Sequence, residues 1–260
     1  MISKVLFLYW GGRKLSWLRY LTVFSFKKHN PDWDIKVYYP TQPTVGNSWA
    51  TDEQIVKYEG DDYFANLSEI AELLPFDMGQ VGKSNDMAEV HKSDIFRLWT
   101  LVNFGGVYSD FDILFTKPMP DISKKKMLYS HHPDGHYAIG LLGCEAGNDT
   151  FNGILEVAKL ATGSKYQSYG STMWGRALED VKLKGWDIPK NLVYSYNWKE
   201  AEQLFTESKG LPKGAIGIHW YGGSIVSGRW ENKLTPETYK DYDSPLRDLI
   251  EAILCTLIST

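Results

Sequence analysis

The sequence has few cysteines, no excess of positive charge and no long apolar run. Its 260 residues contain two cysteines, Cys144 and Cys255, which are far apart in the chain and are expected to be free thiols rather than a disulfide framework. The formal net charge of −4 gives no electrostatic signature for nucleic acid or for an anionic membrane. The N-terminal stretch MISKVLFLYWGG holds too short an apolar run for a signal peptide or a membrane anchor, so we expect a cytoplasmic protein without a transmembrane segment.

The composition and the first forty residues favour one folded α/β domain. Hydrophobic residues make up 43% and aromatic residues 14% of the chain, as in a packed globular protein, and the length suits a single domain. The apolar run 4–10 predicts a buried strand, the spacing in 16–29 predicts a helix, and the alternation in 33–39 predicts a second strand that ends at Pro40. A chain that opens strand, helix, strand is typical of a nucleotide-binding sheet.

The most informative stretch is 92–115, KSDIFRLWTLVNFGGVYSDFDILF. Its first half predicts a helix, and Asp94 and Arg97, three residues apart, lie side by side along the edge of an apolar stripe. Gly105-Gly106 ends the helix, because glycine readily adopts the left-handed conformation of a helix C-terminus, and the next three residues favour a strand. The polar run 84–86 supplies candidate N-cap residues. The apolar stripe of the predicted helix consists of Ile95, Leu98, Trp99 and Val102.

Two aspartates follow this strand with one residue between them. Side chains alternate along an extended chain, so Asp110 and Asp112 leave on the same side and repel each other unless a positive charge lies between them. A divalent cation with oxygen ligands is the natural candidate. Asp-x-Asp is also common in solvated turns, but its place after a buried-looking strand, and after a helix edged by Asp94 and Arg97, favours a metal site.

These residues together resemble a known enzyme family. Three motifs are similar in identity and spacing to the core of the DXD sugar transferases. They are Asp94-x-x-Arg97, Gly105-Gly106-Val107-Tyr108 and Asp110-x-Asp112. That group includes α-mannosyltransferases, α1,4-galactosyl- and α1,4-N-acetylglucosaminyltransferases and bacterial capsule enzymes, and the spacing also occurs in the clostridial glucosylating toxins. The resemblance implies that Asp112 binds Mn²⁺ or Mg²⁺, that Asp110 contacts the nucleotide ribose or a metal-bound water, and that Asp94 and Arg97 hold the donor sugar.

The resemblance also implies a base-stacking residue near the N-terminus. In the family a tryptophan before a glycine pair stacks on the nucleotide base. Here that position falls on Tyr9 or on Trp10, which precede Gly11 at the end of the first expected strand, where ligands of open α/β sheets bind. Both aromatic residues also fit a plain role in the core.

A second matching segment lies near the C-terminus, AIGIHWYGGSIVSGRW at 215–230. A lone histidine after a strand is more often structural, but in the family a histidine followed by Ser-Trp supplies the remaining metal contact and covers the diphosphate. His219 and Ser224 match that spacing, whereas Ile225 stands in place of the tryptophan, with Trp220 or Trp230 as substitutes. The intervening glycines suit a mobile lid.

Other segments carry weaker signals. The polar stretch 41–82 shows a short helical patch at 67–74 and no assignable chemistry. The histidines of HHPDGH at 131–136 lack the spacing of a common zinc site and suit the acceptor side or a polar loop. The stretch 167–174 loosely resembles a family loop at the acceptor pocket, with Ser171 and Thr172 as candidates. An apolar stripe over 246–258 predicts an amphipathic helix that packs on the core, a dimer or membrane contact being the alternative.

We therefore predict a single domain of the GT-A kind, a Rossmann-like mixed α/β sheet flanked by helices. Residues 1–115 are expected to bind the nucleotide-sugar, and residues 116–260 to bind the acceptor and carry the C-terminal lid and helix. The resemblance implies a metal-dependent, retaining glycosyltransferase that moves a sugar from a nucleotide-sugar, first of all a UDP-sugar, to a hydroxyl of a glycan.

Other interpretations stay open. The acceptor could be a hydroxymethylated DNA base, as for short phage transferases, with Lys124–Lys126 or Lys182 and Lys184 as a local basic face. It could also be a protein hydroxyl, as for the toxins. An alternative from another class of protein is a non-catalytic, metal-dependent sugar-binding module. Such a module has no need of the diphosphate chemistry that is implied by Asp94, Arg97, Asp110 and Asp112. A phosphoesterase would need a second cluster of metal-binding acids. The oligomeric state is open.

Overall fold

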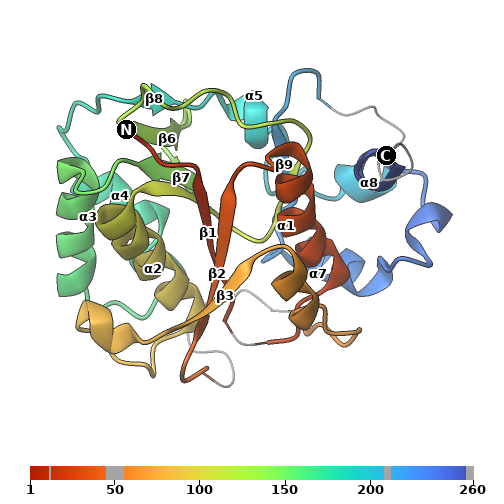
Figure 1. Cartoon of the computed structure of the whole chain (residues 1–260), viewed down its shortest axis with the longest axis horizontal. Helices are drawn as coiled ribbons and strands as arrows, with labels where there is room; N and C mark the ends of the chain where they lie inside the picture. Colours follow the sequence, from red (N-terminus) through yellow and green to blue (C-terminus); the bar gives the residue numbers. More distant parts are fainter. Residues whose placement is uncertain (12, 45–55, 208–211, 256–260) are drawn as a thin grey trace.

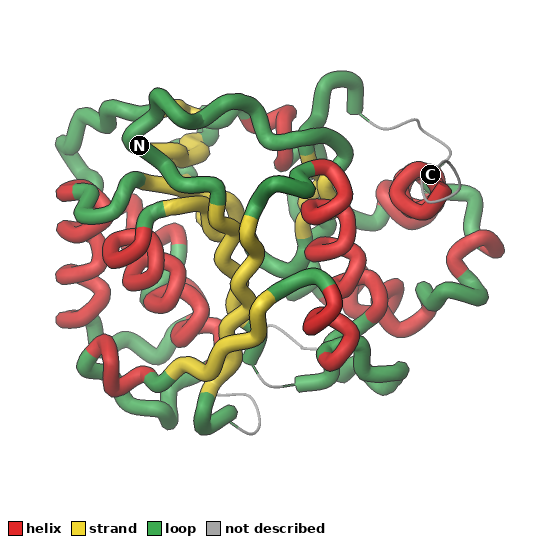
Figure 2. The backbone as a smooth tube through the Cα atoms, in the orientation of Figure 1, coloured by secondary structure: helices red, strands yellow, loops and turns green. Residues whose placement is uncertain are grey.

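The computed structural model describes residues 1–11, 13–44, 56–207 and 212–255. Within these residues a seven-stranded mixed sheet in the order β3-β2-β1-β4-β7-β6-β8 runs through the molecule, and helices lie on both sides of it (Figures 1 and 2). This arrangement confirms the predicted α/β class with a Rossmann-like mixed sheet. The division into a donor half and an acceptor half stays a prediction.

The first half of the sheet is parallel. β1 (Val5–Tyr9) pairs in parallel with β2 (Asp34–Pro40) and with β4 (Gly106–Ser109), and β2 pairs in parallel with β3 (Glu72–Phe76). Helix α1 (Trp17–His29) connects β1 to β2, so the predicted strand-helix-strand opening is confirmed. Its N-terminus is capped by the Ser16 side chain, which accepts a hydrogen bond from the Arg19 amide.

The second half of the sheet reverses direction next to β4. β7 (Tyr137–Cys144) is antiparallel to both β4 and β6 (Met127–His131), and β6 pairs in parallel with the short β8 (Trp186–Asp187). A separate two-stranded sheet joins β5 (Ile113–Phe115) to β9 (Gly217–His219). The other α-helices of the described residues are α2 (Glu89–Phe104), α3 (Asp149–Leu160), α4 (Ser171–Ala177), α5 (Lys190–Val193), α6 (Gln203–Thr206), α7 (Ile225–Lys233) and α8 (Pro245–Cys255).

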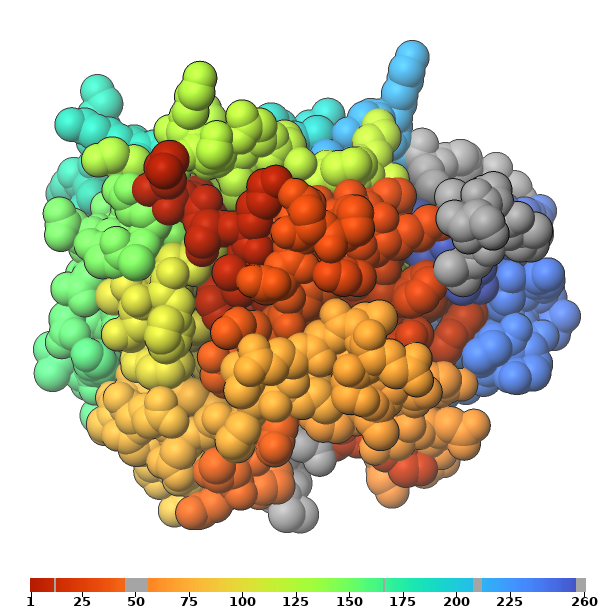
Figure 3. Space-filling view, viewed as in Figure 1, coloured from red at the N-terminus to blue at the C-terminus, as the bar shows by residue number. Residues whose placement is uncertain are grey.

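Alternation along β1 divides the core between the two faces of the sheet. Leu6 and Leu8 pack in one apolar cluster with Phe26 of α1, whereas Phe7 and Tyr9 pack in another with residues of α2, α3 and α4. Burying both faces of β1 is what a central strand of a doubly covered sheet requires. Figure 3 shows the same layering on one surface: the N-terminal third lies in the middle, with the segment of α2 and α3 on one side and the C-terminal segment on the other.

A third cluster attaches the C-terminal part. Leu18 and Leu21 of α1 pack with Ile218 of β9 and with Leu249 and Ile250 of α8. The predicted C-terminal helix and its packing on the core are therefore confirmed up to Cys255, and the remainder of the predicted stretch, 256–258, lies outside the described residues.

Two local predictions are wrong. Helix α2 begins after Ala88, which makes no side-chain cap, because the polar residues of 84–86 are engaged in the preceding turn, where Asn85 Oδ1 accepts from the Met78 amide. The helical patch expected at 67–74 is a 3₁₀ helix, Ala65–Glu69, followed by strand β3. Pairing with β2 overrides the local apolar spacing there, since a strand beside an existing strand satisfies its backbone groups.

The expectation of free cysteines is confirmed. Both cysteines are free, with Cys144 buried and Cys255 exposed. Among the described helices, none combines the length and apolar character that crossing a membrane would require.

Candidate functional site

The turn between α2 and β4 sets the position of the Asp-x-Asp pair. Gly105 has φ +63°, and a Cβ there would lie 2.6 Å from the Ala146 amide nitrogen. Gly106 has φ +126°, and a Cβ there would lie 2.8 Å from the Val5 carbonyl oxygen. Only glycine suits both positions. The predicted glycine stop is thus confirmed, and it delivers β4 into the sheet beside β1, so that Asp110 follows directly at the carboxyl end of the strand.

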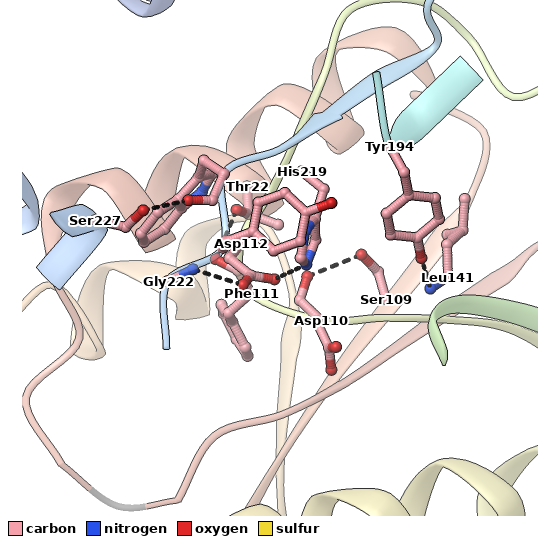
Figure 4. A network of polar contacts seen from close by, with 12 residues as sticks. Thr22, Ser109, Asp110, Phe111, Asp112, Leu141, Tyr194, His219, Gly222 and Ser227 are labelled. Carbon is pink, nitrogen blue, oxygen red and sulfur yellow. Dashed lines mark hydrogen bonds and ion pairs between the residues drawn. The ribbon is translucent and has the colours of Figure 1, made fainter. Parts of the chain in front are cut away.

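The structure brings Asp110, Asp112 and His219 together. One ligand atom from each side chain lies within 4.8 Å of the others, and no other metal-competent group of His, Cys, Asp and Glu occurs among the described residues (Figure 4). His219 reaches this place because β9 pairs with β5, with His219 opposite Ile113, the residue after Asp112. The two parts of the sequence predicted to share a site, although more than a hundred residues apart, therefore meet.

Asp112 is held from the C-terminal side. Its Oδ1 lies 3.1 Å from His219 Nε2, its Oδ2 accepts a hydrogen bond of 2.8 Å from the Gly222 amide, and its carbonyl accepts one of 2.9 Å from the Trp220 amide. Burial opposes ionisation, but the neighbouring His219, the charge of Arg19 and the hydrogen bond from the Gly222 amide outweigh it and lower the pKa of Asp112 below its usual range. Asp112 is therefore a carboxylate at neutral pH.

Asp110 is held from the other side by Arg97 and Tyr108. Arg97 Nη2 lies 3.2 Å from Asp110 Oδ1, and the Tyr108 hydroxyl donates to the same oxygen at 2.8 Å. Burial and the neighbouring charge of Asp112 raise the pKa of Asp110, and Arg97 counteracts them only in part. The two carboxylates of the pair thus differ in protonation tendency because their surroundings differ.

The predicted pair on the helix edge is adjacent to Asp110. Asp94 Oδ1 lies 2.8 Å from Arg97 Nη2, and both side chains are buried. Burial raises the pKa of Asp94 to about 7, with Arg97 opposing the rise and the charge of Asp110 adding to it. Arg97 therefore bridges Asp94 and Asp110 and gives the site a continuous row of charged groups.

The two candidates for base stacking have different surroundings. Tyr9 is 5% exposed, its ring contacts Phe96, and its hydroxyl donates to Glu89 Oε2 at 2.9 Å. Trp10 is half-buried, and its ring lies edge-on to Phe111, between the two aspartates, with centroids 5.4 Å apart. Gly11 follows, and a Cβ there would lie 2.7 Å from the Glu89 Cβ. Trp10 therefore contacts the residue between the two aspartates, and Tyr9 is buried in the core.

The residues after His219 form a turn and a helix start. Ser224 caps α7 by accepting a hydrogen bond of 3.2 Å from the Ser227 amide, and Ile225 is 38% exposed. Trp220 is fully buried, and Trp230 stacks on Phe205 with ring centroids 5.5 Å apart. Of the two tryptophans named as substitutes for the expected one, Trp220 therefore packs inside the protein and Trp230 is half-buried against Phe205.

The other segments with weaker signals lie at the border of the site or away from it. A Cβ on Gly170 would lie 3.3 Å from Asp94 Oδ2, so the start of α4, where Ser171 and Thr172 lie, runs against Asp94. In the HHPDGH loop His132 is buried, its ring lies 5.3 Å from that of Tyr194, and burial lowers its pKa to about 4.

Arg19 is a site residue that sequence reasoning missed. Its guanidinium lies 4.9 Å from the centre of the Trp10 ring and 5.0 Å from that of Trp220, it donates to the Gly222 carbonyl at 3.2 Å, and it forms an ion pair of 2.5 Å with Glu231. Burial opposes its charge, but Glu231 and the two aspartates of the cluster raise the pKa of Arg19 overall. No local motif marks it, because its partners come from β1, β9 and α7.

Tyr194 is the second missed residue. It follows α5, and its hydroxyl accepts a hydrogen bond from the Leu141 amide at 2.9 Å, while its ring lies 5.2 Å from that of His219 (Figure 4). Nothing in the surrounding sequence distinguishes it from an ordinary core tyrosine.

The residues present fit a divalent cation. The two carboxylates offer the oxygen ligands that Mn²⁺ and Mg²⁺ prefer, and the His219 imidazole adds a nitrogen donor. Asp112 Oδ1 is buried and accepts no hydrogen bond from the described residues, while facing His219 Nε2. A buried carboxylate oxygen without a donor is expensive, and a cation shared with His219 would satisfy it.

The comparisons with known proteins agree with this geometry. Residues 21–129, which include Asp94, Arg97 and the Asp110–Asp112 pair, match the family described as glycosyltransferase sugar-binding region containing DXD motif. The match confirms the resemblance to the DXD sugar transferases and identifies the protein class as glycosyltransferase. No curated protein matches this chain.

Solved structures confirm the fold. The PaToxG glycosyltransferase is 18% identical, with a TM-score of 0.50 over 69% of this chain and 70% of that one. The WbbM bifunctional glycosyltransferase is 9% identical, with a TM-score of 0.52 over 97% of this chain and 50% of that one. The present chain thus spans about half the length of the second structure. The predicted GT-A architecture is confirmed.

Proposed function

We propose that this protein is a metal-dependent glycosyltransferase that uses a nucleotide-sugar, with a UDP-sugar as the first donor to test. The observation that carries the proposal is the meeting of Asp110, Asp112 and His219 in one cluster directly beside the Arg97–Asp94 pair. A cation site alone would suit many proteins. A cation site continuous with a buried Arg–Asp pair suits a ligand that has a diphosphate at one end and a sugar at the other.

Each residue of the site has a distinct proposed task. Asp112 and His219 hold the cation, which supplies positive charge toward the departing diphosphate. Asp94 and Arg97 hold the hydroxyl groups of the donor sugar and so orient its anomeric carbon toward the acceptor. Asp110, fixed by Arg97 and Tyr108, contacts the ribose or a water molecule bound to the cation.

The nucleotide base is assigned to Trp10 rather than to Tyr9. Trp10 is half-buried, lies beside Phe111 and is braced on one side by Arg19, whereas the Tyr9 hydroxyl is committed to Glu89 inside the core. Gly11 lets the backbone pass close to Glu89 at this point. Ser224, at the start of α7, remains the proposed contact to the diphosphate, with Ile225 in place of a tryptophan.

The acceptor and the stereochemistry rest on the resemblance alone. A glycan hydroxyl is the proposed acceptor, and retention of configuration is the proposed outcome, with attack on the face that the leaving group vacates. The leaving phosphate would take the acceptor proton. A location in the cytoplasm belongs to the same proposal.

The test is release of nucleoside diphosphate from UDP-, GDP- and dTDP-sugars with water as acceptor, in Mn²⁺. Asp112→Asn should lower the release by at least about 100-fold, because the leaving group loses its countercharge. Asp121→Asn, at a turn where the aspartate only accepts from the Ser123 amide, is the matched control and should keep full release.

The same assay separates the enzyme from a sugar-binding module. A module would bind a donor in a metal-dependent way and release no diphosphate. Full release by Asp112→Asn in Mn²⁺ would refute the site assignment.

A further inference from the structure

Gly140, on β7, leaves a space between three polar atoms of the site. A Cβ on Gly140 would lie 3.1 Å from Asp110 Oδ2, 3.2 Å from the Tyr194 hydroxyl oxygen and 3.6 Å from His219 Nε2. Two of these atoms belong to residues of the metal cluster. The Tyr194 hydroxyl therefore faces the same small volume as the cluster.

The side chain of Tyr194 is held firmly from outside that space. It is 3% exposed, its ring lies between those of His219 and His132 at 5.2 and 5.3 Å, and its oxygen accepts the Leu141 amide hydrogen at 2.9 Å. A hydroxyl can also donate. Across the described parts of the chain, no acceptor pairs with the hydrogen of this hydroxyl, so a buried donor is left for a ligand.

Resting on the cation site of the proposed function, we infer that Tyr194 is a positioning residue of that site. Its hydroxyl donates into the space above Gly140, toward the oxygen ligands around the cation, and so raises the affinity for Mn²⁺. Gly140 is also required, because any side chain there would occupy the space into which the Tyr194 hydroxyl donates. Residues that donate to metal ligands from the second shell typically change metal affinity by about 10- to 100-fold when they are removed.

Tyr221 offers a matched comparison. Its ring lies even closer to His219, at 4.2 Å between centroids, but its hydroxyl donates to the Tyr196 carbonyl at 2.7 Å. Removing either hydroxyl therefore deletes one buried hydrogen bond beside His219, whereas only the Tyr194 hydroxyl faces the cluster.

The experiment measures Mn²⁺ affinity without any donor, from the electron paramagnetic resonance signal of unbound Mn²⁺. Tyr194→Phe should weaken the Mn²⁺ dissociation constant by about tenfold, and Tyr221→Phe should leave it within twofold of the unsubstituted protein. Gly140→Ala is the second variant, which keeps the tyrosine and should also weaken Mn²⁺ binding. Melting temperatures of all variants report the structural cost, which is expected to be similar for the two tyrosines.

The outcomes separate this inference from the proposed function. If Tyr194→Phe binds Mn²⁺ as tightly as the unsubstituted protein while Asp112→Asn loses binding, the cation site stands and the role of Tyr194 is refuted. Equal weakening by Tyr221→Phe would also refute it, because a general disturbance of His219 would then explain the loss. If the unsubstituted protein binds no Mn²⁺, the cation site fails and this inference fails with it.

Discussion

At the scale of single residues, the site gives chemically identical carboxyl groups different pKa values. Asp112 lies beside His219 and accepts from the Gly222 amide, which lower its pKa, whereas Asp110 is half-buried next to another carboxylate and its pKa rises. Asp94, beneath Arg97, has a pKa of about 7. The neighbours of these three aspartates therefore shift their pKa values in different directions. Shifted pKa values are common at functional sites.

The Asp94 carboxyl predicts a dependence of stability on pH. Its pKa is about 7 in the folded protein and near the ordinary value of 3.8 in the unfolded chain, so between these values the folded state binds more protons. The free energy of unfolding should therefore fall as the pH rises from about 4 to about 7, by up to about 1 kcal/mol per pH unit from this group, and level off above that.

The variant Asp94→Asn isolates this contribution. Urea unfolding of the metal-free protein and of Asp94→Asn should give a difference in free energy that shifts in favour of the variant from pH 5 to pH 7. Parallel profiles for the two proteins over that range would show that Asp94 is not shifted.

At the same scale, the sequence was most informative where function is local. Asp94, Arg97, Asp110 and Asp112 lie within nineteen residues, and their helix-glycine-strand setting could be predicted from apolar spacing and glycine. Arg19 and Tyr194 could not be predicted, because Arg19 meets the site through Glu231 and Gly222, and Tyr194 meets it through Leu141 of β7, which no local pattern encodes.

At the scale of elements, Glu231 fastens α7 to α1. Its carboxylate accepts from the Ser16 hydroxyl at 2.6 Å and forms the ion pair with Arg19, whose guanidinium also holds the Gly222 carbonyl. These contacts join the capped N-terminus of α1 to the segment that contributes His219 and Gly222. This contact places the C-terminal segment over the Asp-x-Asp pair.

Glu231→Gln should lower the free energy of unfolding by about 3 kcal/mol, because it leaves a buried guanidinium without its countercharge. Glu156→Gln, which removes the exposed partner of Lys159 within α3, is the control and should cost less than about 1 kcal/mol. Chemical denaturation measures both. A loss for Glu231→Gln no larger than for the control would show that the ion pair does not hold α7 in place.

The turn before β4 gives a second prediction at this scale. Gly105→Ala should destabilise the protein by about 1 to 3 kcal/mol, since φ is +63° and the new Cβ would lie 2.6 Å from the Ala146 amide. Gly153→Ala, inside α3 where a Cβ meets nothing within 4 Å, should instead stabilise it by about 0.5 to 1 kcal/mol. Thermal unfolding decides the sign for each variant, and a neutral Gly105→Ala would contradict the strained turn.

Elements with strong periodicity were predicted well, and those fixed by pairing were not. The opening strands, α1, α2 and α8 follow from apolar spacing, because each buries a face that its sequence marks. The edge strand β3 was mistaken for helix, because its residues become a strand only beside β2. The start of α2 was misplaced, because the polar residues 84–86 bond to their own turn rather than to the helix.

At the scale of the whole molecule, the site is assembled from segments that are distant in the chain. The end of β1 supplies Trp10, α2 supplies Asp94 and Arg97, the end of β4 supplies the aspartates, and β9 supplies His219. All of them meet where the parallel part of the sheet gives way to antiparallel pairing at β4 and β7. In open α/β sheets, ligands bind beyond the carboxyl ends of the strands, which is where this assembly lies.

The most direct test of the central claim is the shift in melting temperature with UDP-, GDP- and dTDP-sugars, each with and without Mn²⁺. A ligand that binds only the folded state raises its stability by about 2.7 kcal/mol at a hundred times its dissociation constant. The account predicts that one nucleotide family raises the melting temperature, that the rise requires Mn²⁺, and that Asp112→Asn abolishes it. Stabilisation that is the same with and without Mn²⁺, or no stabilisation by any of the donors, would contradict the account.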